Sequence, residues 1–327
     1  MILAGDVGGT KANLALFEMQ MGKLRRVAQR RFESKNHAQF EDIVTEFVRQ
    51  FLPGSEARKL KAAGFGVAGP VVEQKVRATN LPWIVDAVTL AHTLLVEKVV
   101  LLNDLEATAY SLDLLHPEEI CTLNEGTRVP EANRALIAAG TGLGEAILFW
   151  DGTRHIVSAT EGGHCDLAPR TEQEIELLRF LKKRQEEVDL EAVLSGRGFR
   201  VVHEFLDPKK RHPSFDAPGA DAAPEITRLG LGGACPVCVE TLEIWTALYG
   251  AEAGNLALKA LARGGLYVAG GIAVKILPKL QDGTFVRAFR QKAKFGIFLG
   301  QIPIYVVLNE EAPLLGAAAQ AAARLGV

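Results

Sequence analysis

The sequence predicts an α/β protein made of two related halves, and two features of its pattern support this. Short apolar runs that suit buried strands alternate with segments of helical spacing along the chain. In addition, a strand, a glycine-rich turn and a second strand follow one another twice, at residues 2–17 and 134–150. The 327 residues fit two domains of about 150 residues each. We therefore expect two domains with a cleft between them.

The first half begins with a hairpin. A strand at residues 2–4 leads into a turn at 5–10 and a strand at 12–17, with too few residues between for a helix. Apolar residues three and four apart predict a helix over 40–52, which Pro53 ends. The next elements are a buried strand at 62–68, a helix from its N-cap Asp86 to 95, a buried strand at 98–102 and a helix at 105–115.

The second half repeats the hairpin, with strands at 134–138 and 145–150. A capping box at residues 171–174 opens a helix. We expect a short helix between Asp189 and Gly196, with Glu191 in its first turn. The remaining elements are a surface loop at 208–224, a long helix at 238–262, strands at 266–269 and 302–308, and a final helix from Pro313.

The composition excludes several classes of protein. Lys and Arg number 37 against 39 Asp and Glu, a formal net charge of -2, which argues against a nucleic-acid-binding protein. The longest apolar stretch, residues 136–150, is shorter than the roughly 20 residues of a membrane helix and contains Glu145. Residues 1–6 reach a glycine and an aspartate at once, which does not suit a signal peptide. We expect a cytoplasmic chain with neither nucleic-acid nor membrane partners.

Two glycine-rich turns are candidates for binding phosphate. The first contains Gly5, Asp6, Val7, Gly8, Gly9 and Thr10. Backbone N–H groups in such a turn can surround anionic oxygens, and the carboxylate of Asp6 becomes useful if Mg²⁺ is bound to it, directly or through water. The alternative is an ordinary hairpin turn with a capping aspartate. The spacing of a Walker A loop is absent.

The second turn contains Gly140, Thr141, Gly142 and Gly144. Its G-x-G-x-G pattern differs from the dinucleotide fingerprint, and a strand rather than a helix follows it, which disfavours a nicotinamide dehydrogenase. Two such turns, one in each half, could hold one polyphosphate from both sides.

Several polar residues are candidates for binding or catalysis. Asp104 follows a buried strand, where α/β sheets place ligands, and its carboxylate could accept the proton of an attacking hydroxyl. The alternative is that Asp104, or Asn103 beside it, only caps the next helix. Glu161 and His164 flank two glycines and suit vicinal sugar hydroxyls. Glu191 could bind a ligand or complement a helix dipole.

The four cysteines give a weaker indication. Without a secretory signal, disulfides are not expected. Cys235 and Cys238 form a Cys-x-x-Cys pair, but the extra ligands that we considered for zinc, His164 and Cys165, lie in another segment. We therefore expect ordinary thiols.

The motifs, taken together and in order, resemble those of the bacterial glucokinase family over essentially the whole chain. They are GDVGGT at residues 5–10, LLND at 101–104, AGTGLG at 139–144, EGGHCDLAP at 161–169, EAVLSG at 191–196, VAGGI at 268–272 and PLLG at 313–316. The chain is less similar to the repressor/open-reading-frame/kinase (ROK) group of sugar kinases, whose cysteine-rich zinc motif is absent. Lys11 departs from the asparagine that many relatives carry at this position.

This resemblance implies the actin-like, ribonuclease H-like fold and transfer of the ATP γ-phosphate to the 6-hydroxyl of glucose in glycolysis. It implies a small domain at 1–112 joined by a C-terminal helix at 311–327, a large domain at 113–310, and a homodimer. Asp104 would be the general base. The sugar would contact Asn103, Asp104, Glu161, His164 and Glu191. ATP would contact residues 5–10, Gly140, Thr141, Gly142, Gly270 and Gly271, with Mg²⁺ at Asp6.

The residues leave other functions open. A kinase of the same fold could act on mannose, fructose or an N-acetylated amino sugar, and the donor could be polyphosphate or ADP. A sugar-sensing regulator would need a DNA-binding helix-turn-helix, which the sequence does not show. The presence of Asp104 together with both glycine-rich turns disfavours an inactive sugar-binding module.

Overall fold

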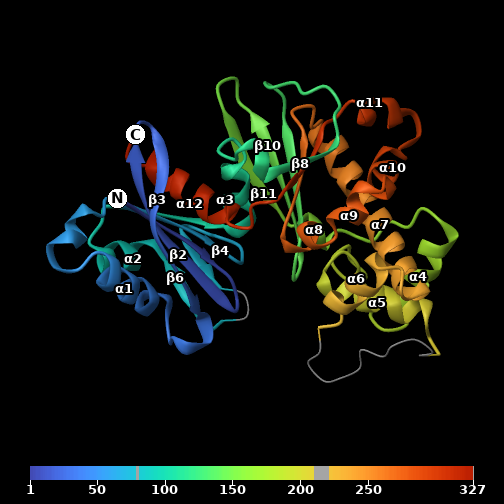
Figure 1. Ribbon diagram of the computed structural model, residues 1–327, viewed down its shortest axis with the longest axis horizontal. Coiled ribbons are helices and arrows are strands. Elements are labelled where there is room, and N and C mark those ends of the chain that lie inside the picture. Colours follow the sequence, from blue (N-terminus) through green and yellow to red (C-terminus); the bar gives the residue numbers. More distant parts are fainter. Residues whose placement is uncertain (79–80, 210–220, 327) are drawn as a thin grey trace. The chain divides into compact units, whose positions relative to one another are not determined.

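A computed structural model describes residues 1–78, 81–209 and 221–326. The chain forms two compact units (Figure 1). Unit 1 contains residues 1–117 together with 309–327, and unit 2 contains residues 118–308. Each unit has its own mixed β-sheet, with helices and loops around it, so the α/β class is confirmed.

The sheet of unit 1 has the strand order β3-β2-β1-β4-β7. The first three strands form an antiparallel meander, and β1, β4 and β7 run parallel to one another. The five strands are β1 (Ile2–Val7), β2 (Lys11–Gln20), β3 (Lys23–Glu33), β4 (Ala62–Val67) and β7 (Lys98–Asn103). A separate two-stranded sheet is formed by β5 (Lys75–Arg77) and β6 (Ile84–Asp86).

Successive residues of β1 contribute to two different hydrophobic cores, because strand side chains alternate between the faces of the sheet. Leu3 packs into a core with Phe40 and Leu90, from α1 and α2. Ile2 packs into a second core with Ala317 of α12. The helices of this unit are α1 (Phe40–Phe51), α2 (Ala87–Leu94), α3 (Asp104–Ser111) and α12 (Ala312–Ala323), with short 3₁₀ helices η1 (Ser34–Asn36) and η2 (Gly54–Lys59). The 3₁₀ helix η3 (Pro117–Glu119) lies at the boundary between the units.

Unit 2 repeats the strand order of unit 1 and adds one strand. Its sheet is β11-β10-β9-β12-β13-β8, in which β9, β12 and β13 are parallel, as β1, β4 and β7 are. The strands are β8 (Ile120–Asn124), β9 (Arg134–Ala139), β10 (Leu143–Trp150), β11 (His155–Thr160), β12 (Leu266–Ala269) and β13 (Ile304–Val307). The expectation of two halves of related structure is therefore confirmed.

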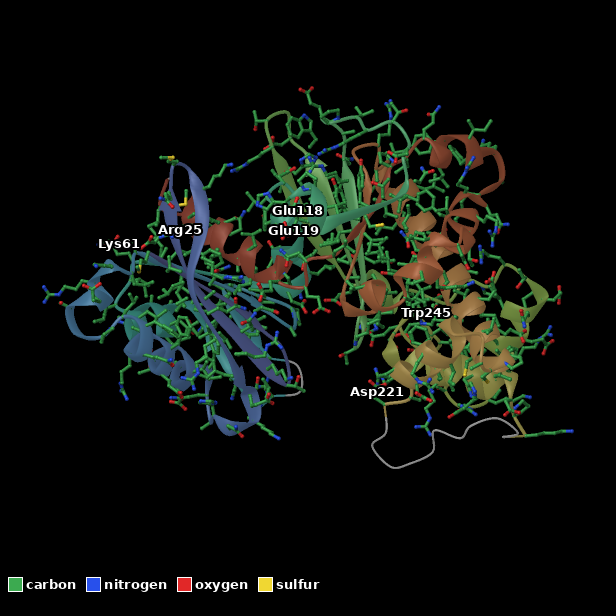
Figure 2. The ribbon with its side chains drawn as sticks, viewed as in Figure 1. Arg25, Lys61, Glu118, Glu119, Asp221 and Trp245 are labelled. Carbon is green, nitrogen blue, oxygen red and sulfur yellow. The ribbon has the colours of Figure 1, made fainter. Side chains whose placement is uncertain are left out.

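The long helix α7 (Pro236–Ala260) is the centre of the helical core in unit 2. Trp245, labelled in Figure 2, is buried on this helix and stacks on Phe199 with ring centroids 4.6 Å apart. The other helices are α4 (Glu172–Lys182), α5 (Gly196–Leu206), α6 (Ala223–Leu231), α8 (Gly271–Lys275), α9 (Leu277–Gln281), α10 (Thr284–Arg290) and α11 (Gly296–Gly300), with η4 (Gly162–His164) and η5 (Ala293–Phe295). None of the described helices has both the length and the apolar character needed to cross a membrane.

Three expectations about local structure need correction or restriction. The short helix expected around Glu191 is a hydrogen-bonded turn, and Gly196 begins α5 instead of ending a helix. Pro224 lies in the first turn of α6, so the expected loop at 208–224 ends earlier, and residues 210–220 lie outside the described residues. The final strand is shorter than expected and comprises four residues, Ile304–Val307.

The crossing of α12 and α3 in unit 1 depends on a glycine. A Cβ atom at Gly316 would lie 1.7 Å from the backbone oxygen of Ala107 and 3.0 Å from the backbone nitrogen of Ser111. Figure 1 shows α12, in red, beside α3. Two helix backbones can approach this closely only where one of them lacks a side chain, because backbone atoms cannot move away as a flexible side chain can.

We predict that Gly316→Ala destabilises the protein. Helix propensity alone would favour alanine by about 1 kcal/mol, but the clash with Ala107 should reverse the sign and cost about 1–3 kcal/mol. Urea unfolding followed by circular dichroism measures the difference. Ala323→Ser, on an exposed position of the same helix, is the control and should change stability by less than about 0.5 kcal/mol. Equal or greater stability of Gly316→Ala would contradict this packing.

Candidate functional site

Asp6 and Asp104 lie near one another at the carboxyl end of the parallel strands in unit 1. The strand register aligns Val7, Val67 and Asn103, the last residues of β1, β4 and β7, so Asp104 directly follows this edge. A Cβ atom at Gly66 would lie 3.0 Å from Cβ of Ala107, in the first turn of α3, and 3.6 Å from Cα of Asp104. The small residue in β4 thus lets the first turn of α3 lie close to the strand.

The two carboxylates influence each other electrostatically. Asp6 is only partly exposed, and its burial, followed by the negative charge of Asp104, raises the pKa of Asp6 from about 3.8 to about 7. Arg31 acts in the opposite direction. A buried acid beside a second acid is stabilised either by a proton or by a cation. Carboxylate oxygens are ligands that Mg²⁺ prefers, so Asp6 has the chemistry to hold this ion.

Asn103 and Asp104 both contribute to the start of α3. Oδ1 of each side chain accepts a hydrogen bond from the backbone N–H of Leu105, at 2.9 Å in both cases. Nδ2 of Asn103 also donates to the backbone oxygen of Gly69 at 3.1 Å. Asn103 is the N-cap of the helix, and Asp104 is its first residue. The capping interpretation thus holds for Asn103, but capping does not account for the second carboxylate oxygen of Asp104.

The first glycine-rich turn is shorter than the sequence suggested. Gly5, Asp6 and Val7 belong to β1 and pair with β2 on one side and β4 on the other. A Cβ atom at Gly5 would lie 2.6 Å from Cδ1 of Phe65, so this glycine serves core packing. The sequence alone could not distinguish a glycine that packing requires from one that a turn requires.

The turn itself comprises residues 8–10. The amide of Gly8 donates to the backbone oxygen of Lys11 at 2.9 Å and closes the turn. The backbone amides of Gly9 and Thr10 make no hydrogen bond to any other residue that the structure describes. Thr10 is exposed. The turn therefore offers two backbone donors and a hydroxyl to an anion.

In unit 2, the corresponding turn at residues 140–142 packs against Glu191. A Cβ atom at Gly142 would lie 2.3 Å from Oε2 of Glu191, and the same oxygen accepts a hydrogen bond from the amide of Leu143 at 3.0 Å. The backbone oxygen of Gly140 accepts from the amide of Gly196 at 2.9 Å. Thr141, between the two glycines, is exposed. The turn is thus fixed at both ends, while Thr141 faces outward.

Gly270 and Gly271 lie beside this turn, where β12 passes into α8. Gly270 has a positive φ of 88°, and a Cβ atom there would lie 2.5 Å from the backbone oxygen of Ala139 at the end of β9. Positive φ and close backbone approach both require glycine. The two glycine-rich segments that the sequence singled out in the second half are therefore neighbours.

The segment from Glu161 to His164 packs on the same elements. A Cβ atom at Gly163 would lie 2.0 Å from the backbone oxygen of Leu143, and the oxygen of Gly163 accepts from the amide of Glu191 at 2.9 Å. Glu161 and His164 are both exposed. Unit 2 thus brings together Glu161, His164 and Glu191, which are up to 30 residues apart in sequence.

Glu191 lies on a single turn, in which the amides of Val193 and Leu194 both donate to the backbone oxygen of Leu190. The amide of Glu191 donates to the backbone oxygen of Gly163, and the amide of Ala192 donates to Oδ1 of Asp189, both at 2.9 Å. The Glu191 carboxylate also lies 3.6 Å from the guanidinium of Arg197. These contacts hold the carboxylate in one position.

Asp189 orients His164. From the sequence, Asp189 was expected only to begin a short helix. Nδ1 of His164 lies 2.8 Å from Oδ2 of Asp189. This hydrogen bond raises the pKa of His164, and the nearby charges of Glu191 and Glu161 act in the same direction. Because a carboxylate accepts, Nδ1 carries a proton, which leaves Nε2 to accept from or donate to a ligand.

Glu145 is a second residue whose importance the sequence did not reveal. It is buried on β10, and a Cβ atom at Gly162 would lie 2.1 Å from its Oε2. Burial and then the charge of Glu252 raise the pKa of Glu145 to about 7. The signal in the sequence is that Glu145 is a lone acid within the apolar stretch at residues 136–150.

Comparison with known proteins identifies the family of this chain. The family model described as Glucokinase matches residues 3–324. The glucokinase of Nostoc sp. (strain PCC 7120) is 36% identical over 341 residues, covering 98% of this chain and 99% of the relative. The chain belongs to the glucokinase family. A glucokinase of Neisseria meningitidis serogroup B is 35% identical over 318 residues, covering 97% of this chain and 93% of the relative.

Solved structures confirm the fold. A glucokinase from an Antarctic psychrotroph has a TM-score of 0.85 and 30% identity, covering 98% of each chain. A glucokinase from Balamuthia mandrillaris in complex with glucose has a TM-score of 0.80 at 20% identity, covering 98% of this chain and 93% of that one. A ROK family glucokinase from Streptomyces griseus, in complex with glucose and AMPPNP, has a TM-score of 0.66 at 20% identity, covering 98% of this chain and 99% of that one. The actin-like, two-domain α/β fold is therefore confirmed.

We predict that Asp189→Asn lowers the pKa of His164. In the wild type the Asp189 carboxylate raises this pKa above the ordinary value of about 6.5, whereas an amide stabilises the imidazolium less. Titration of the histidine ring signals by NMR measures both midpoints. Asp166→Asn, an exposed aspartate in the same region, should leave the midpoint unchanged. Identical midpoints in the wild type and Asp189→Asn would contradict the assigned hydrogen bond.

We also predict that Glu145 makes stability depend on pH. Its pKa is raised from about 4.5 to about 7 in the folded chain, so between these values the folded state keeps a proton that the unfolded state has lost. The free energy of unfolding should therefore fall as pH rises through this range, by at most about 1.4 kcal/mol per pH unit. Glu145→Gln cannot ionise, so its fall should be smaller than that of the wild type, and the part that remains comes from other raised groups such as Asp6.

The measurement is urea unfolding of the wild type and of Glu145→Gln at several values of pH between about 5 and 8. Glu118→Gln, at an exposed position, is the control and should follow the wild type. Parallel curves for the wild type and Glu145→Gln would show that the buried carboxyl does not titrate in this range.

Proposed function

We propose that this protein transfers the γ-phosphoryl group of ATP to the 6-hydroxyl of glucose, giving glucose 6-phosphate and ADP. The observation that carries the proposal is the position of Asp104, beside Asp6 at the carboxyl end of three parallel strands, in a chain of the glucokinase family. Two solved structures of the same fold contain glucose, and one of them also contains AMPPNP.

Asp104 acts as the general base in this proposal. A sugar hydroxyl must lose its proton as it attacks the γ-phosphorus, and a carboxylate within hydrogen-bond reach accepts it. The backbone N–H of Leu105 donates to Oδ1 of Asp104, which restrains the carboxylate. The carboxylate is further held at the first turn of α3, where the helix dipole stabilises its negative charge.

The other sugar hydroxyls contact Asn103, Glu161, His164 and Glu191. Each hydroxyl both donates and accepts, and this set offers acceptors in the two glutamates and groups of either kind in the amide and the imidazole. Asp189 acts as a positioning residue, because its hydrogen bond to Nδ1 leaves Nε2 of His164 for the sugar. Glu191 is held by Leu143 and Arg197.

ATP contacts the two glycine-rich turns in this proposal. Residues 8–10 offer the backbone amides of Gly9 and Thr10, and residues 140–142 offer the exposed hydroxyl of Thr141. Gly5 and Val7 support the first turn through the pairing of β1. Gly270 and Gly271, where backbone replaces side chains, lie next to the adenosine.

Asp6 holds Mg²⁺ directly or through water in this proposal. When bound there, the ion neutralises negative charge on the transferred phosphate. The carboxylate of Asp6 also lies beside Asp104, whose charge the ion offsets. The donor type and the mutual repulsion of the two acids both favour a cation at this position.

We also propose that the small domain corresponds to residues 1–112 with 311–327 and the large domain to 113–310. The compact units that the structure shows support this division. We propose a homodimer on the family resemblance alone, and a cytoplasmic location on the sequence pattern.

We predict that Asp104→Asn lowers kcat about 10²–10⁴-fold, because the amide cannot accept the hydroxyl proton. The KM for glucose should change by less than about tenfold, since the amide keeps the shape of the side chain. A coupled assay for ADP release measures both. Asp113→Asn, which makes the same chemical change at an exposed position after α3, should behave as the wild type. Turnover retained in Asp104→Asn would eliminate Asp104 as the base.

A further inference from the structure

Three metal-binding side chains meet in the helical core of unit 2. The ligand atoms of His203, Cys235 and Cys238 all lie within 4.8 Å of one another. All three residues are buried, with exposed fractions of 6%, 4% and 0%. The sequence had suggested ordinary thiols because His164 and Cys165 lie elsewhere, and it gave no reason to join His203 to the cysteines.

The packing of three helices produces this cluster, which we call the His-Cys-Cys cluster. His203 lies in the last turn of α5, Cys235 is the N-cap of α7, and Cys238 lies in the first turn of α7. The Cys-x-x-Cys spacing turns both thiols toward the same side at the start of a helix. A Cβ atom at Gly230 would lie 2.7 Å from the backbone oxygen of Cys238, so α6 packs closely against the same turn.

The chemistry of the His-Cys-Cys cluster fits zinc. Two thiolates and one imidazole are ligands of structural and catalytic zinc sites, and together with water or a fourth ligand they complete a tetrahedron. Ligands at about 2.0–2.3 Å from a zinc ion lie about 3.5–3.8 Å apart. The three ligand atoms, all within 4.8 Å of one another, already lie near these separations.

Charge balance also favours zinc in the His-Cys-Cys cluster. Two thiolates and Zn²⁺ together are neutral, so the loaded cluster can remain in an apolar environment without a net charge. Aromatic side chains near it, such as Phe199 and Trp245, are buried and stacked on one another. The cluster has no residue in common with the groups that we propose for glucose, ATP or Mg²⁺.

We propose that His203, Cys235 and Cys238 bind one zinc ion, which joins the end of α5 to the start of α7. All three ligands are buried among packed helices, so the ion stabilises the packing of α5 on α7. Binding exchanges the thiol protons for the metal, and the free energy of binding stabilises the folded unit. This site is independent of the proposed kinase activity.

The first test measures metal in the full chain, produced in medium supplemented with zinc and then freed of loosely bound ions by gel filtration. Plasma mass spectrometry should find about one zinc ion per chain. Replacement by Co²⁺ should give the thiolate-to-cobalt charge-transfer band and the visible bands of a tetrahedral site. Zinc well below one ion per chain, with no cobalt spectrum, would overturn the proposal.

The second test uses variants. His203→Gln and Cys238→Ser should each lower zinc affinity at least about tenfold, while Cys165→Ser, which changes an exposed cysteine outside the cluster, should keep the metal. If these variants fail to fold, the wild type still decides the question, because a chelator should lower its Tm and added Zn²⁺ should restore it.

A Cys-x-x-Cys pair at the start of a helix can also form a disulfide. Intact-mass measurement under denaturing conditions distinguishes the two states, because a disulfide removes two hydrogens and leaves no thiol for alkylation. Two alkylated thiols at Cys235 and Cys238 after removal of the metal support the zinc site. A Cys235–Cys238 disulfide in the freshly prepared protein would overturn it.

Discussion

The approach of two carboxylates, Asp6 and Asp104, is the constraint on which the arrangement of unit 1 depends. The parallel register of β1, β4 and β7 brings their ends level, so that Asp104 influences the pKa of Asp6, and Gly66 leaves room for Ala107 of α3. Like charges repel, so the fold must hold them in place. The packing on both faces of the sheet holds them, and a bound cation would reduce their repulsion.

In unit 2, Glu191 connects the segments that carry the other candidate site residues. Its backbone and carboxylate contact the loop of His164 and the turn at residues 140–142, so two motifs distant in sequence are fixed by one residue. A Cβ atom at Gly142 would meet the carboxylate of Glu191, and one at Gly163 would meet the backbone of Leu143. The glycine-rich motifs of this half thus serve packing between loops as much as any contact with a ligand.

Local signals predicted local structure well. Asp86 caps α2 as expected, with its Oδ1 accepting from the amide of Val88 at 2.8 Å, because an N-cap depends only on the next few residues. The charged edge strand β3 was not predicted, since its pattern has no regular alternation of apolar residues. The bond from His164 to Asp189 and the meeting of His203 with Cys235 depend on tertiary packing, which no short window of sequence contains.

The central claim is that the protein places a phosphoryl group on the 6-hydroxyl of glucose. The most direct measurement is ³¹P NMR of the product formed from glucose, ATP and Mg²⁺, with mannose and fructose as alternative acceptors and 6-deoxyglucose as a control that lacks the accepting hydroxyl. The account predicts glucose 6-phosphate as the main product, with the highest kcat/KM for glucose and no transfer to 6-deoxyglucose. Phosphorylation of 6-deoxyglucose, transfer to another hydroxyl, or no transfer to glucose would contradict it.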